Sequence, residues 1–232
     1  MKKLVSGLML LILVGAGCKE KSVYSNFNGF IQGTTYSVVY EYNNIEPADL
    51  KQRVETILHD FDRSLSLYVD SSILSRINRN EDVVPDTFFK EVFRKSVTLS
   101  AMTDGAFDAT VGPLVKAWGF GPDAKKSFTE ARRDSLLGLI GMDKVSLLNG
   151  RVIKTDPDIS LDFNAIAQGF SVDVVSKFLD EQGIDNYLVE IGGEVRARGK
   201  KAGKNWRIGI DKPVDNNMSP GENLQAVIEI SD

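Results

Sequence analysis

The clearest periodic pattern of apolar residues lies between residues 47 and 65. Apolar side chains recur there at intervals of three and four, which is the spacing of one face of an α-helix. They are Leu50, Val54, Ile57, Leu58, Phe61 and Leu65. Pro47 stands at the start, where proline suits the first helical turn. The segment therefore predicts an amphipathic helix.

Four further segments predict helices, at residues 71–78, 86–102, 127–140 and 164–182. Asp86 can cap the second of these, because its carboxylate can accept hydrogen bonds from free backbone N–H groups. The third opens with Ser127-Phe128-Thr129-Glu130, the pattern of a capping box. Glycine follows the second and fourth segments and favours their termination.

Strand patterns alternate with these helices. Residues 30–42 are rich in β-branched and aromatic side chains and predict a strand after Gly33. Asn149-Gly150 between two short apolar segments predicts a hairpin. Later strands are expected at 186–191, 194–198, 205–210 and 224–230, with pairing partners for the last one beyond residue 232. Hairpins of this kind favour an α+β fold, with mixed or antiparallel sheets and packed helices, over a parallel doubly wound sheet.

Residues 104–122 fit neither a plain helix nor a plain strand. They contain four glycines and two prolines together with six large apolar side chains. This combination predicts a long, buried, irregular segment, and such segments usually carry function.

Composition and charge narrow the class of protein. The 232 residues are 42% hydrophobic and 26% charged, as in folded globular proteins. The net charge of −4 argues against a nucleic-acid partner, because phosphate binding depends on Lys and Arg. One Cys and one His exclude both a disulfide framework and a Cys/His zinc site, so a metal would need oxygen ligands.

The first residues have the organisation of an export signal. Lys2 and Lys3 precede a short apolar run that ends in Gly15-Ala16-Gly17, and the sole cysteine, Cys18, follows. The pattern predicts a lipoprotein signal over 1–17, lipidation at Cys18, a tether over 18–28 and a folded domain over 29–232. Ordinary secretion with an incidental cysteine is the alternative.

Three segments combine polar residues with small ones. They are Asp104–Thr110, Asp158–Asp173 and Glu190–Glu194. Each also has a purely structural explanation, because aspartates cap helices and turns and a Gly-Gly pair forms a tight hairpin.

Taken together and in order, these segments resemble the ApbE family of FAD:protein FMN transferases. The matching stretches also include Gly33-Thr34-Thr35-Tyr36, Leu65-Ser66-Leu67-Tyr68, Ser75-Arg76-Ile77-Asn78, Gly105 to Leu114, Trp118-Gly119-Phe120-Gly121, Leu161 to Gly169 with Val172-Asp173, and Gly192-Gly193-Glu194. They span nearly all of the chain after the signal.

The resemblance implies an ApbE-like, T-fold-related architecture and a phosphoryl transfer. Members bind FAD and Mg²⁺, join FMN to a Ser or Thr hydroxyl of an exported flavoprotein, and release AMP. Some members hydrolyse FAD instead. The implied localisation is the periplasmic side of a bacterial cell membrane or outer membrane, with attachment through Cys18.

The resemblance also assigns site residues. The backbone carbonyl of Ala165 corresponds to a metal ligand, and Gln168 stands where many members have a phosphate-contacting Lys. Tyr68 corresponds to an aromatic position that packs on the ligand. A segment that contacts the flavin and adenine nucleotide corresponds to Ala106, Phe107 and Asp108. No single residue is assigned as catalytic.

Family members continue for roughly another hundred residues, which supply an Asp and a Thr to the metal site. Two explanations therefore stand at this point, a fragment of a full-length transferase or a naturally shortened chain. The alternative functions are an inactive or hydrolytic FAD-binding periplasmic lipoprotein and a lipoprotein domain with no nucleotide site.

Overall fold

The computed structural model describes residues 23–42, 45–120, 129–214 and 221–230. The predicted signal and Cys18 lie outside these residues. None of the helices in the described ranges combines the length and the apolar character needed to cross a membrane.

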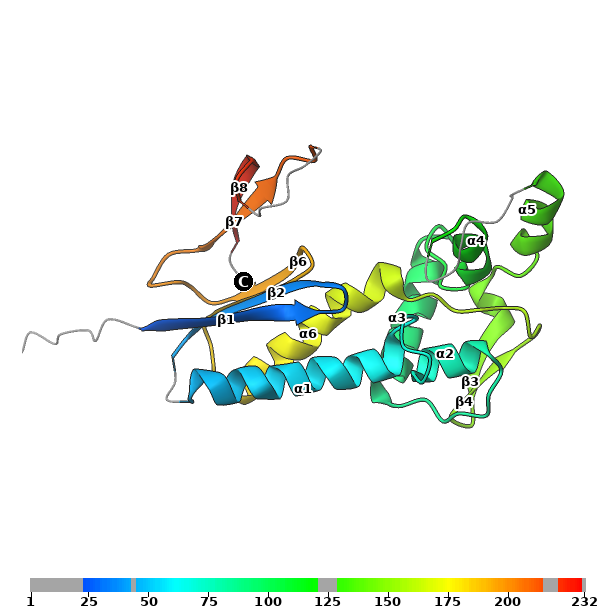
Figure 1. Ribbon diagram of the computed structural model, residues 1–232, viewed down its shortest axis with the longest axis horizontal. Coiled ribbons are helices and arrows are strands. Elements are labelled where there is room, and N and C mark those ends of the chain that lie inside the picture. Colours follow the sequence, from blue (N-terminus) through cyan, green and yellow to red (C-terminus); the bar gives the residue numbers. More distant parts are fainter. Residues whose placement is uncertain (1–22, 43–44, 121–128, 215–220, 231–232) are drawn as a thin grey trace, which may run out of the picture.

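A four-stranded antiparallel sheet forms one half of the fold. Its strands are β1 (Tyr24–Ile31), β2 (Thr34–Glu41), β5 (Tyr187–Ile191) and β6 (Glu194–Arg198), in the order β1-β2-β5-β6. Helices α1 (Pro47–Leu65) and α6 (Asn164–Glu181) pack against the sheet (Figure 1). The apolar face of each element is thereby buried in a shared core that includes Val38, Leu50 and Val189.

Strand β1 corrects the predicted boundary of the folded domain. Residues 24–28 were expected in the tether, yet they pair with β2 along their whole length. The Phe27 ring packs edge-on against Tyr36, with ring centres 6.3 Å apart, and its centre lies 6.0 Å from that of Tyr40. Strand β1 contains two Asn and a Gly, which are poor strand formers. Pairing with β2, rather than local preference, therefore makes it a strand.

The other half contains a second apolar core around helix α3 (Thr87–Met102), whose cap Asp86 accepts a hydrogen bond from the Phe89 N–H. Short helix α2 (Ile73–Asn78), 3₁₀-helix η1 (Met142–Lys144) and hairpin β3 (Val145–Leu148) and β4 (Arg151–Lys154) complete it. Asn149 and Gly150 both have positive φ, 49° and 75°, as the predicted hairpin turn requires.

Within the segment 104–122, the described residues 104–120 are more regular and less buried than expected. They contain a short helix, α4 (Gly112–Ala117), started by proline in its first turn. Ala109 and Thr110 are buried, but Trp118 and Phe120 are 55% and 68% exposed. Glycines and prolines at the ends of a helix do not interrupt it, which explains the wrong prediction.

Two other expectations need correction. Helix α5 (Glu130–Leu137) is capped by Thr129, whose hydroxyl accepts a hydrogen bond from the Arg132 N–H. The helix ends three residues before the predicted end at residue 140, and Ser127 lies outside the described residues. The last strand, β8 (Leu224–Ile230), already has a partner, because it pairs antiparallel with β7 (Trp206–Asp211).

Candidate functional site

The candidate site surrounds the first turns of α6. The Asp162 backbone N–H donates to the Ala109 carbonyl at 2.8 Å, which joins the two segments that carry most of the predicted site residues. An Asp162 carboxylate oxygen accepts from the Asn164 N–H at 2.8 Å. The N–H groups of Ile166 and Ala167 donate to the Phe163 carbonyl. Among the described residues, the Ala165 N–H takes part in none of these hydrogen bonds, so this helix start keeps one donor for a ligand.

A cavity of about 670 Å³ lies on one side of these turns, and we call it the Tyr68 cavity. Residues from the end of α1, the following loop and α6 line it, among them Phe61, Leu65, Tyr68, Asn164, Ala167 and Gln168. Tyr68 is 67% exposed, so its ring is open to a ligand. An aromatic ring, apolar walls and two side-chain amides form a surface suited to a nucleotide base and its polar groups.

Gln32 and Asp62 also line the Tyr68 cavity and add polar side chains to it. The sequence did not predict that these two residues lie together. Burial raises the pKa of the Asp62 carboxyl above its ordinary value, and the nearby His59 and Gln32 oppose this rise. The Gln32 carbonyl oxygen accepts from the Ser171 hydroxyl at 3.3 Å. Its amide nitrogen is buried and has no partner with hydrogen-bonding geometry, although it lies near Asp62.

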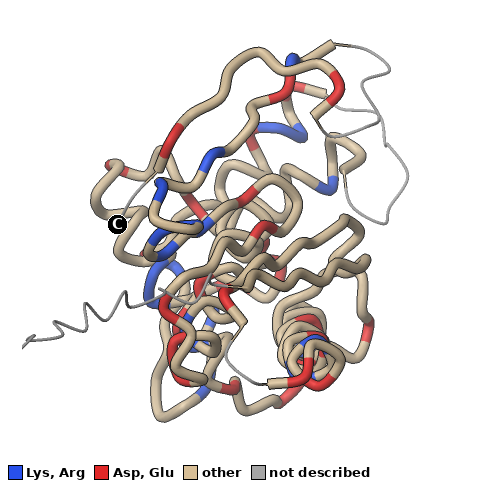
Figure 2. Tube along the Cα trace, turned by 90° about the vertical axis from the view of Figure 1, so that its left-hand side faces the viewer, with Lys and Arg blue, Asp and Glu red and all other residues tan. Residues whose placement is uncertain are grey.

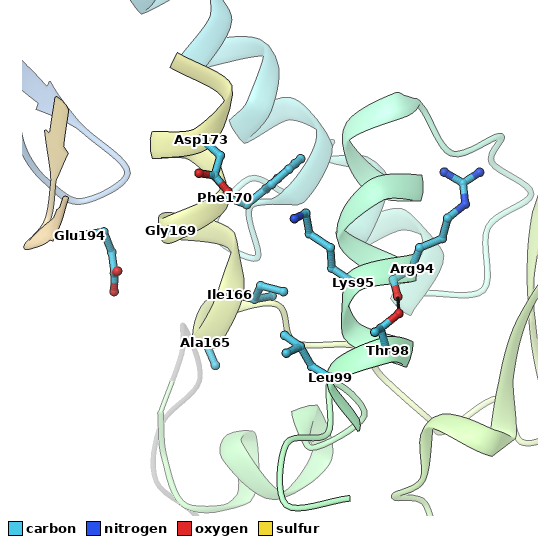
Figure 3. A pocket seen from close by; sticks show the side chains of 10 residues that line it. All are labelled: Arg94, Lys95, Thr98, Leu99, Ala165, Ile166, Gly169, Phe170, Asp173 and Glu194. Atoms are coloured by element: carbon cyan, nitrogen blue, oxygen red, sulfur yellow. Dashed lines mark hydrogen bonds between the residues drawn. The ribbon is translucent and has the colours of Figure 1, made fainter. Parts of the chain in front are cut away.

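A second cavity, of about 580 Å³, lies on α6 beside α3, and we call it the Lys95 cavity (Figure 3). Leu99, Ile166 and Phe170 form its apolar floor, and Lys95 places its ammonium group 5.4 Å from the centre of the Phe170 ring. Figure 3 shows α3 on one side of α6 and Glu194 on the other. Ala165 is exposed and lines this cavity, not the Tyr68 cavity.

The two cavities lie on opposite faces of α6. Ala165, Gly169 and Asp173, which line the Lys95 cavity, are spaced by four and share one face. Asn164 and Gln168, which line the Tyr68 cavity, are also spaced by four and share another face. At 100° per residue, the two sets of side chains diverge around the helix, and the helix start lies between the two cavities.

The predicted nucleotide-contacting segment takes a different place. Ala106 is exposed and Phe107 packs against the second core, and neither lines the two cavities. The Asp108 carboxylate accepts from the Thr110 N–H at 2.7 Å, from the Thr110 hydroxyl at 2.5 Å and from the Met142 N–H at 3.1 Å. Asp108 is therefore committed to holding this loop against η1.

The described residues do not complete a magnesium site. No group of three or more Asp, Glu, His or Cys side chains within the described ranges is placed to hold a metal ion. The carbonyl of Ala165 is one oxygen, and Asp173 is paired with Arg196 at 2.8 Å. Because Mg²⁺ needs six oxygen ligands, these residues alone do not fit it.

Comparisons with known proteins give the site its context. The sequence profile of the ApbE family matches residues 32–232. FAD:protein FMN transferase of Vibrio cholerae is 34% identical over 237 residues, covering 99% of this chain and 69% of that protein. Its namesake in Haemophilus influenzae is 37% identical over 229 residues, covering 92% and 66%. The chain thus spans about two thirds of the length of these relatives.

The solved structures agree with this similarity. A flavin transferase ApbE from Vibrio cholerae superposes with a TM-score of 0.81 at 33% identity, covering 91% of this chain and 70% of that one. The fold and these similarities therefore define an α+β protein of the flavin-transferase class. The chain belongs to the ApbE family. This finding confirms the predicted family, the transferase class and the α+β fold.

Proposed function

We propose that this protein binds FAD and transfers FMN to a Ser or Thr hydroxyl of an acceptor protein, with release of AMP. The observation that carries the proposal is the Tyr68 cavity at the start of α6, in a chain of this family. The cavity offers an aromatic ring for stacking and the amides of Asn164 and Gln168 for polar contacts. The unpaired N–H of Ala165 and the positive end of the helix dipole favour a diphosphate beside the helix start.

The proposed reaction exchanges the phosphoanhydride bond of the diphosphate for a phosphoester bond to the acceptor. The acceptor hydroxyl oxygen forms a bond to the phosphorus on the flavin side of the diphosphate. The bond from that phosphorus to the bridging oxygen breaks, and AMP leaves with the bridging oxygen. The hydroxyl proton passes to solvent. The protein's part is to position both groups in line and to stabilise the charge on the phosphate oxygens.

The proposal includes dependence on Mg²⁺, although the described residues by themselves supply too few ligands to hold the ion. When bound, Mg²⁺ would neutralise phosphate charge. Gln168 contributes a neutral amide, so this position supplies no positive charge to the phosphates. This shortage of positive charge favours one alternative, an FAD-binding protein that does not transfer FMN.

We also propose that the protein is exported and anchored to a bacterial membrane through Cys18, and that its acceptor is an exported flavoprotein. The support is the signal pattern of residues 1–18. The amount of protein in the membrane fraction, compared between the wild type and Cys18→Ser, tests the anchor.

The transfer assay mixes the protein with FAD, Mg²⁺ and a library of short peptides that each contain one central threonine. We expect covalently bound, fluorescent flavin on a subset of peptides together with release of AMP, and no labelling after chelation of Mg²⁺. Tyr68→Ala should raise the KM for FAD about fivefold or more, because base–aromatic stacking contributes about 1–3 kcal/mol. Tyr68→Phe keeps the ring and should change little.

The outcomes separate the proposals. Binding of FAD with no release of AMP and no labelled peptide would leave the binding protein as the function. Release of AMP without labelled peptide would indicate a hydrolase.

A further inference from the structure

We infer that the Lys95 cavity is where the acceptor polypeptide docks, as an extended segment that carries the hydroxyl between α3 and strand β6. This inference rests on the proposed function and names the site of its second substrate. The first argument is the position of the cavity. It lies on the face of α6 away from the Tyr68 cavity, and the two share the helix start.

The geometry of phosphoryl transfer requires the acceptor hydroxyl to approach the phosphorus from the side opposite to the leaving AMP. The attacking and leaving oxygens lie roughly in line with the phosphorus between them. With the adenosine half in the Tyr68 cavity and the diphosphate beside Ala165, AMP departs toward Tyr68. The acceptor hydroxyl must then arrive from the opposite side, which is the Lys95 cavity.

The lining suits an extended peptide. Leu99, Ile166 and Phe170 provide an apolar floor for side chains, and the rim is polar. Gly169 adds no side chain to the helix surface, and Glu194 lies beside it, because a Cβ at this position would be in van der Waals contact with Glu194 Oε2 at 3.5 Å. The volume of about 580 Å³ accommodates a few side chains rather than a folded domain.

Strand β6 gives the segment a backbone partner. It is an edge strand of the described sheet, so alternate residues direct their N–H and C=O groups away from β5. Its first residue, Glu194, lines the cavity, while at its other end the Arg198 carbonyl accepts from Trp206 Nε1 at 2.9 Å. An extended peptide can therefore pair beside Glu194, which is a common mode of peptide recognition.

Glu194 also provides polar contact at the reacting end. Its carboxylate is exposed, and among the described residues no cation or N–H is bound to it. It can accept a hydrogen bond from the incoming hydroxyl before the proton passes to solvent. Figure 3 shows Glu194 on one side of α6 and Arg94 and Lys95 on the other, and all three residues line the cavity.

Thr98 permits a test that blocks the cavity without touching the Tyr68 cavity. It is exposed on α3, lines the Lys95 cavity, and donates its hydroxyl to the Arg94 carbonyl at 3.0 Å. Thr56 on α1 is its matched control, because it is also exposed and donates to the Gln52 carbonyl at 2.8 Å. Thr56 lines neither cavity.

The experiment compares the wild type, Thr98→Trp and Thr56→Trp, using FAD, Mg²⁺ and the peptide that the wild type labels best. Thr98→Trp should raise the KM for the peptide about tenfold or more, while the KM for FAD stays at the wild-type value. Thr56→Trp should match the wild type in both. Glu194→Gln should lower labelling of the peptide without weakening FAD binding.

Two results would overturn the inference. One is an unchanged peptide KM in Thr98→Trp. The other is a raised KM for FAD, which would mean that the Lys95 cavity holds part of the dinucleotide. Failure of the proposed function is distinguishable, because it is seen in the wild type as absent labelling of every peptide, and that result removes this inference as well.

Discussion

The turn between β5 and β6 links backbone conformation to the proposed binding of FAD. Gly192 and Gly193 both have positive φ, 58° and 94°. A Cβ on Gly192 would collide with the side-chain amide of Gln168, whereas a Cβ on Gly193 would meet nothing within 4 Å. Gly192→Ala therefore perturbs both the turn and Gln168, and Gly193→Ala perturbs the turn alone.

The magnitudes separate the two effects. A residue with a Cβ in a left-handed conformation costs about 1–2 kcal/mol, so both variants should lower the free energy of unfolding by about this amount. Displacing Gln168 also removes its contact in the Tyr68 cavity. A hydrogen bond to a charged group contributes about 1.5–3 kcal/mol, so only Gly192→Ala should weaken FAD binding, by roughly 10-fold to 150-fold.

The assay pairs urea unfolding with titration of FAD by fluorescence. Gln168→Ala and the double variant Gly192→Ala with Gln168→Ala complete a double-mutant cycle. We expect Gly192→Ala, Gln168→Ala and the double variant to share one FAD affinity, because each loses the same contact. The reasoning is refuted if Gly193→Ala weakens FAD binding as much as Gly192→Ala, or if Gly192→Ala binds FAD like the wild type.

Two further predictions concern the carboxylates of Asp108, which is partly buried, and Asp162, which is buried. Asp108→Ala should lower the free energy of unfolding, measured in urea, by about 2–4 kcal/mol, because it leaves donors of Thr110 and Met142 without a partner. Unchanged urea unfolding together with lost FAD binding would instead make Asp108 a ligand contact. Burial raises the pKa of the Asp162 carboxyl above its ordinary value. The folded protein therefore loses stability as the pH rises and this carboxyl ionises, and it keeps that stability at lower pH. Asp162→Asn should therefore be more stable than the wild type at neutral pH and lose this advantage in acid. Thermal unfolding measured across pH tests this, with Asp158→Asn at an exposed position as the control. An advantage that does not depend on pH would contradict the reasoning.

Charged residues of both signs are spread over the part of the chain that the structure describes. Figure 2 shows acidic and basic positions interspersed along the described trace. Several basic side chains are engaged with acids, as in the pairs of Arg196 with Asp173 and of Arg198 with Asp180. Such pairing reduces the positive charge available to a nucleic-acid backbone.

Local sequence determined most of the helices and strands. The spacing of Leu50, Val54 and Leu58 requires a helix with one buried face, and Asn149-Gly150 requires a tight hairpin. The capping of α3 by Asp86 was equally local. Strand β1 was not, because Asn26, Asn28 and Gly29 favour no strand until β2 supplies hydrogen-bond partners.

The sequence by itself also identified the segments around Tyr68, Ala165 and Gln168, because their order and residue types match a family pattern. Only the tertiary structure divided them between two cavities and committed Asp108 to the support of its own loop. It alone brought Asp62 and Gln32 together. Residues 30 positions apart meet because packing of α1 and the β1–β2 turn near α6 sets their distance, and no local periodicity encodes such packing.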